Sequence, residues 1–142
     1  RTGMLYVGEE DAGIWAMFGR GQGGAENRKL VAPVDNRMLV ADVEGLAIAP
    51  EGTDGGYLVA SSQGDNAYAL FRLPDMTPAG RFRIAGGAFG ATEETDGIAL
   101  DNRDFGPDFP GGLFIAQDGI NPPAAQNFKY VRWDEVLAAL EG

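Results

Sequence analysis

The sequence contains no cysteine and no histidine among its 142 residues. Without cysteine there is no disulfide, no thiolate nucleophile and no zinc–thiolate site. Without histidine a Ser-His-Asp triad is excluded, as are most transition-metal sites, so Ser61 and Ser62 have no obvious activating base. Any catalysis must therefore depend on carboxylates, amides, lysine, arginine, tyrosine or a hard metal ion.

Basic residues are also scarce. The chain has 11 lysines and arginines against 21 aspartates and glutamates, which gives a formal net charge of -10. A surface of this sign repels nucleic acid and anionic membranes, so neither is expected as a partner. No apolar run is long enough to span a membrane. The acidic balance is compatible with binding cations.

Long helices are not expected, because 22 glycines and 8 prolines favour short elements joined by turns. Three segments share a pattern of glycine, an apolar strand, and then acids and amides. They are "GMLYVGEED" (3–11), "GYLVASSQGDN" (56–66) and "GLFIAQDGIN" (112–121). Their spacing of roughly 50 to 55 residues suits a four-stranded propeller blade.

The middle repeat contains a whole blade, with strands predicted at 44–50, 57–63, 67–73 and 81–86. The first repeat supplies three strands, at 4–8, 13–18 and 28–34, and the last supplies 97–102, 112–117 and 127–131. Apolar residues at helical spacing predict a C-terminal helix over 133–141. The glycine-rich segment 19–24 is predicted to be a loop.

These elements predict an all-β fold built from propeller blades of four-stranded antiparallel sheets, followed by a short helix. The blade repeats cover roughly 3–40, 42–86 and 94–131, so residues 1–142 form a single partial propeller domain. Closed propellers usually have four or more blades, so the remaining propeller blades are an expected partner. Open sheet edges predict poor stability without a metal ion or a partner.

Acids and amides fall at corresponding places in the three repeats. Some follow a second strand and others precede a first strand, and in a propeller both positions lie on the same face. Those that follow second strands are Glu9, Glu10, Asp11, Gln63, Asp65, Asn66, Gln117, Asp118 and Asn121. Those that precede first strands are Asp42, Glu44 and Asp96.

Converging carboxylates repel one another unless a cation or raised pKa values relieve them. Oxygen ligands without histidine or cysteine favour calcium over zinc or copper. Bound calcium would attract a phosphate-rich substrate and polarise a phosphoryl group. Asp and Asn before glycine are also ordinary turn formers, so a purely structural interpretation stays open for each single residue.

The segments "LYVGEEDAGIW", "DVEGLAIA", "GYLVASSQGDNAYALF", "ETDGIAL", "FPGGLFIAQDG" and "QNFKYVRWDEV" together resemble the C-terminal part of the β-propeller phytases. The resemblance implies a six-bladed, secreted or periplasmic, calcium-dependent enzyme that releases phosphate from phytate (inositol hexakisphosphate). It further implies that Glu10 and Asp96 are catalytic positions and that metal-bound water, rather than a protein nucleophile, attacks the phosphate. The metal ligands carried over from the family's motifs are Glu10, Asp42, Glu44, Gln63, Asp96, Asp118 and Asn121.

Two positions depart from the family pattern. Where the family has a further metal-bridging aspartate, this chain has Gly90 or Phe89, and Glu93 lies nearby but out of register. Where an acid often follows the "QDG" motif, this chain has Ile120. Two alternatives to a phytase therefore stay open: a non-catalytic, calcium-stabilised propeller that acts as a binding module, and a lactonase-like propeller.

Overall fold

The computed structural model describes residues 3–19 and 25–142, so most of the predicted 19–24 loop lies outside the described residues. A first group of strands comprises β1 (Met4–Glu9), β2 (Gly13–Phe18) and β3 (Lys29–Pro33), with the short 3-10 helix η1 (Ala25–Asn27) before β3. A second group comprises β4 (Val43–Glu51), β5 (Gly55–Ser62), β6 (Ala67–Leu73) and β7 (Thr77–Phe82), with the 3-10 helix η2 (Gln63–Asp65) between β5 and β6. The last comprises β8 (Ile98–Asp101), β9 (Leu113–Asp118), β10 (Asn127–Arg132) and helix α1 (Trp133–Glu141).

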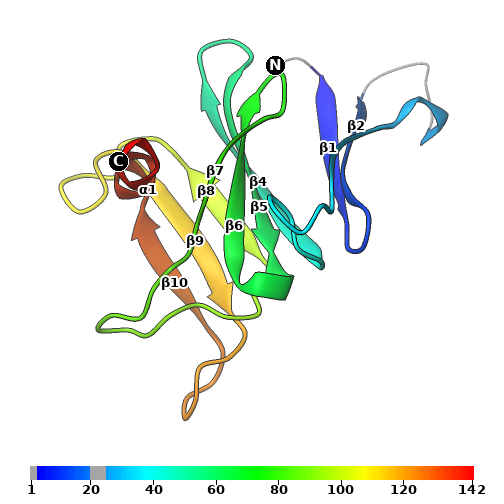
Figure 1. The fold of residues 1–142 in the computed structure, drawn as a ribbon. Coiled ribbons are helices and arrows are strands. Elements are labelled where there is room, and N and C mark those ends of the chain that lie inside the picture. Colours follow the sequence, from blue (N-terminus) through cyan, green and yellow to red (C-terminus); the bar gives the residue numbers. More distant parts are fainter. Residues whose placement is uncertain (1–2, 20–24) are drawn as a thin grey trace.

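The strands form three separate antiparallel sheets, in the orders β1-β2-β3, β4-β5-β6-β7 and β10-β9-β8. The sheets stand side by side, with β4 in contact with both β1 and β8 (Figure 1). This arrangement is that of propeller blades, and it confirms the all-β prediction with a short C-terminal helix. No helix among the described residues is long and apolar enough to cross a membrane.

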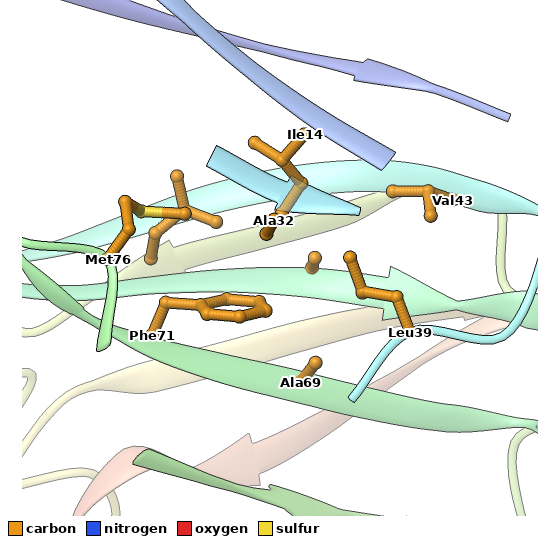
Figure 2. Close-up of a cluster of buried hydrophobic side chains, with 9 residues drawn as sticks. Ile14, Ala32, Leu39, Val43, Ala69, Phe71 and Met76 are labelled. Carbon is orange, nitrogen blue, oxygen red and sulfur yellow. The ribbon is translucent and has the colours of Figure 1, made fainter. Parts of the chain in front are cut away.

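The middle blade is buried on both faces. Side chains alternate along a strand, so Leu58 and Ala60 of β5 join the core shared with the first blade, whereas Tyr57 and Val59 join the core shared with the last blade. Because both faces are covered, residues 57–60 of the strand are all apolar instead of alternating with polar residues. Figure 2 shows the first of these cores, in which the labelled side chains come from blades one and two and from the segment between them: Ile14, Ala32, Leu39, Val43, Ala69, Phe71 and Met76.

The second core is rich in aromatic rings. Tyr68 stacks on Phe82 at a centroid distance of 5.0 Å and meets Phe114 edge-on at 5.2 Å. Trp133, the first residue of α1, packs edge-on against Tyr57 at 6.1 Å. Aromatic pairs in these geometries contribute about 0.5–1.5 kcal/mol beyond the burial of their area. Helix α1 therefore packs against the core between the last two blades, and it spans the residues predicted for it, 133–141.

One strand differs from its prediction. The fourth strand of the middle blade is Thr77–Phe82 and not 81–86. Pro78 and Gly80 indicate a turn in the sequence, but β7 is an edge strand, where proline is tolerated. Gly80 lies against Leu140 of α1, and its missing side chain leaves the room that Leu140 occupies.

Two features of individual side chains bear on the packing. Arg81 of β7 is half-buried and binds Asp65 at 2.5 Å. Some phenylalanines lie outside the core, since Phe18, Phe89 and Phe128 are exposed.

Candidate functional site

Backbone hydrogen bonds tie together the loops that carry the predicted site residues. The amide of Val43 donates to the carbonyl of Glu10 at 2.9 Å, which joins the end of the first blade's β1 loop to the start of β4. The amide of Gln63 donates to the carbonyl of Asp42, also at 2.9 Å. Three predicted ligands, from the loops after β1, before β4 and after β5, are thus held in one region by main-chain contacts.

Two glycines allow these segments to approach closely. A Cβ added to Gly45 would lie 2.8 Å from the carbonyl oxygen of Asp96, which is closer than such contacts normally come. A Cβ on Gly64, in η2, would lie 1.8 Å from the carbonyl oxygen of Ala41. Glycine after the acid-x-acid pair is therefore required where β4 meets the neighbouring blade, and glycine after Gln63 is required where η2 meets the segment before β4.

Four carboxylates share this region. Burial, followed by the negative charges of three neighbouring acids, raises the pKa of Glu44, and those neighbours are Glu10, Asp96 and Asp42. Within residues 3–19 and 25–142 none of the four forms an ion pair with lysine or arginine. Glu44 of the middle blade thus lies within electrostatic reach of acids from the first and last blades, and no ion pair among the described residues offsets this repulsion.

Asp96 is held in a defined orientation by amide side chains. The Nε2 of Gln63 donates to Oδ1 of Asp96 at 2.6 Å, and the backbone amide of Asp96 donates to Oε1 of Gln117 at 2.9 Å. Gln117 is one of the amides that follow second strands, but it was not among the predicted metal ligands. The alternation of β9 explains its position, since Phe114, Ala116 and Asp118 are buried while Gln117 lies on the opposite face.

Asp118 and Asn121, the two remaining predicted ligands, make other contacts. Asp118 is 0 % exposed and pairs with the ammonium of Lys129. Its Oδ1 also accepts a hydrogen bond of 3.0 Å from the amide of Glu93. Although burial would raise the pKa of Asp118, these bonds hold it below its usual value. Asn121 donates to the carbonyl of Ala125 at 2.9 Å and so closes its own loop.

The two departures from the family pattern supply no acid to the cluster. Phe89 is 86 % exposed and the neighbouring Gly90 has a positive φ of 80°. Ile120 is also exposed. Glu93 uses its backbone amide to bind Asp118, and its side chain is exposed. The site therefore depends on the four clustered acids and the amides beside them.

The donor set fits a hard cation in chemical type and in charge. Carboxylates and an amide converge without a histidine or a cysteine, and oxygen ligands of this kind suit calcium. In the part of the chain that the structure describes, however, no three acidic side chains surround one point closely enough to hold a metal ion. The roles of the predicted ligands in metal binding, and of Glu10 and Asp96 in catalysis, stay predictions.

These features define a β-propeller protein in which one end of three adjacent blades carries a group of carboxylates that have no basic partner in the described part of the chain. A family model described as Phytase matches residues 1–142, so the chain belongs to the phytase family. It is similar to a protein of Bacillus subtilis (strain 168) named 3-phytase, with 41% identity over 146 residues. That match covers 97% of this chain and 37% of the relative, so the chain spans little more than a third of the relative's length. Membership of this family sets aside the lactonase-like alternative.

Proposed function

We propose that the protein containing this chain is a calcium-dependent phytase that hydrolyses phosphate monoesters of inositol hexakisphosphate. The observation that carries the proposal is the cluster of Glu10, Asp42, Glu44 and Asp96 in a chain of the phytase family. Among the residues that the structure describes, no lysine or arginine forms an ion pair with any of the four. A protein of formal charge -10 repels a polyphosphorylated substrate. A bound divalent cation reverses the local sign of the charge and so makes such a substrate acceptable.

The residues of this chain have distinct parts in the proposed site. The four carboxylates and the side chain of Gln63 would hold calcium, which supplies charge neutralisation at the phosphoryl group and a bound water of lowered pKa. Gln63 and Gln117 fix Asp96 through the hydrogen bonds already described. Because these groups are oriented before substrate arrives, they need little reorganisation when charge develops on the phosphate.

Phosphate release from phytate tests the proposal. Initial rates are measured with added calcium and with a calcium chelator, for the longest natural polypeptide that carries these residues and for the 142-residue chain. Glu44→Gln and Asp96→Asn keep the size of each side chain and remove its charge. Asp101→Asn is the matched control, because Asp101 lies at the end of β8 and pairs with Arg103 on the surface.

We expect calcium-dependent release in the wild type and in Asp101→Asn, and a loss of about 100-fold or more in the two cluster variants, as for removal of a charge-stabilising group. Release that persists in the chelator, or that is unchanged in both cluster variants, would contradict the proposal.

A non-catalytic, calcium-stabilised propeller is the second candidate. It is supported by the absence, among the described residues, of three acids placed around one point, and by the lack of an acid at Gly90 and Ile120. In that case calcium raises the unfolding temperature of the protein while phytate releases no phosphate. The same samples therefore separate the two candidates.

We also propose that the remaining propeller blades cover the two outer sheets of this chain. Supporting this, β1 exposes Leu5 and Val7, and β10 exposes Phe128 and Tyr130. The relative is also much longer than this chain.

We further propose a location outside the cytoplasm, secreted or periplasmic. It fits the calcium proposal, since extracellular modules work with weak calcium sites, whose dissociation constants are about 10⁻⁴–10⁻³ M. Fractionation of the producing cells tests the location.

A further inference from the structure

The segment that presents Asp96 has no regular secondary structure of its own. The connection from β7 to β8 covers residues 83–97, and its later part, residues 91–96, enters no helix or strand. Even so, Thr92 and Thr95 are buried. A buried irregular segment must have partners for its backbone and side-chain polar groups, and these partners come from the blades on both sides.

The middle blade holds the segment through hydroxyl groups. The phenol oxygen of Tyr68 lies 2.8 Å from Oγ1 of Thr92 and 2.7 Å from Oγ1 of Thr95. Ser61 donates from its hydroxyl to the carbonyl of Thr95 at 2.6 Å. Ser61 thus has a structural function, in keeping with the absence of an activating base.

The last blade holds the same segment through a buried ion pair. Lys129 donates to the carbonyl of Ala91 at 2.6 Å and to Oδ2 of Asp118. Asp118 accepts from the amide of Glu93 through its other oxygen. The amide of Gly119 donates to the carbonyl of Glu93 at 2.8 Å. Lys129 is 8 % exposed, so both members of the pair are shielded from water.

We propose that Asp118 and Lys129 are positioning residues that place Asp96 in the carboxylate cluster, and that Asp118 is not itself a calcium ligand. The inference rests on the proposed calcium site. Both oxygens of Asp118 are already used, one by the ammonium and one by the Glu93 amide, and the contacts of the pair lie on residues 91 and 93 of the segment that ends at Asp96.

The two members of the pair have separable effects. Asp118→Asn keeps an oxygen that accepts from the Glu93 amide but leaves the Lys129 charge buried without a partner, which is strongly destabilising. The double variant Asp118→Asn/Lys129→Met removes the stranded charge and fills a similar volume; it keeps an oxygen for the Glu93 amide but loses the bond to the Ala91 carbonyl. A positioning pair therefore predicts that the second substitution rescues the first in part, whereas a calcium ligand predicts no rescue because the carboxylate is still missing.

Calcium titration calorimetry on the full chain measures this difference. We expect Asp118→Asn to weaken calcium binding about 10-fold or more, as for other residues that orient metal ligands, and the double variant to recover a measurable part of that loss. Met76→Ala is the control for a general loss of stability, because Met76 is buried in the other core, at the opposite end of the blade. The unfolding temperature of each variant establishes that it is folded.

A second readout does not require calcium. Hydrogen–deuterium exchange in chelator should show faster exchange of the Glu93 and Asp96 amides in Asp118→Asn, and exchange closer to the wild type in the double variant. This result would support positioning even if the wild type binds no calcium, an outcome that would refute the proposed function alone. If Asp118→Asn does not fold, the double variant decides by itself. A double variant that is folded but has lost calcium binding, or unchanged exchange of both amides in the single variant, would overturn the inference.

Discussion

Replacing Tyr68 with phenylalanine should loosen the segment that carries Asp96 and leave the aromatic core intact. The Tyr68 side chain is 1 % exposed, and burial raises the pKa of its phenol, which therefore stays protonated at neutral pH. Its one hydroxyl is hydrogen-bonded to the hydroxyls of both Thr92 and Thr95. Phenylalanine retains the ring contacts with Phe82 and Phe114 and removes only the hydroxyl.

The expected loss of unfolding free energy follows from these contacts. A buried polar group left without its partner costs about 1–3 kcal/mol, and two threonine hydroxyls lose a partner here. Either hydroxyl can rotate toward another acceptor, so we expect a total of about 1–3 kcal/mol and not twice that. For a chain of this length the loss corresponds to a fall in unfolding temperature of roughly 3–12 °C.

Urea unfolding followed by tryptophan fluorescence measures the loss, and hydrogen–deuterium exchange locates it. The matched control is Tyr130→Phe, since Tyr130 is 64 % exposed and its change should alter stability by less than about 0.5 kcal/mol. We expect the Thr95 and Asp96 amides to exchange faster in Tyr68→Phe. The reasoning is refuted if both variants have the same stability, or if the extra exchange is spread evenly over the whole sheet.

Three further changes follow from the same structure. In metal-free buffer Glu44→Gln should raise the unfolding temperature at pH 7, because the raised pKa of Glu44 means that its ionisation opposes folding. The gain in unfolding temperature should vanish below the ordinary glutamate pKa of about 4.5 and grow as pH rises through the raised pKa of Glu44. Thermal scans from pH 4 to 8 measure this dependence. Gly64→Ala should destabilise by about 1–3 kcal/mol in urea because its methyl would meet the Ala41 carbonyl, whereas Gly87→Ala, with no atom in reach, should not. Phe114→Ala should cost about 3–5 kcal/mol, since this fully buried ring leaves a cavity between the last two blades. Equal urea midpoints for Phe114→Ala and the wild type would contradict that packing.

The strands that can be predicted from this sequence are those buried on both faces. β6 begins and ends where the prediction places it, because its continuous apolar run is bounded by Asn66 and Pro74. β7 could not be placed in the same way. Its stability comes from pairing with β6 and from contact with α1, far along the chain, and its own residues resemble a turn.

The sequence predicts which acids belong to the candidate site only where the three repeats place them at matching positions next to their strands. Acids after β1 and before β4 and β8 lie near enough to Glu44 to raise its pKa, in keeping with repetition of one blade. The position of Asp118 was not predicted, because a motif match does not show which face of a strand a side chain occupies. The register of β9 and β10 pairs Ala116 with Lys129, which puts Asp118 diagonally across from the lysine on the same buried face.

Titration of the full chain with calcium, followed by calorimetry, tests most directly whether the converging carboxylates form a cation site. The account predicts saturable binding in the wild type, weakened about 10-fold or more by Asp96→Asn and unchanged by Asp101→Asn on the surface. Binding that is absent from the folded wild type, or equally strong in all three proteins, would contradict it.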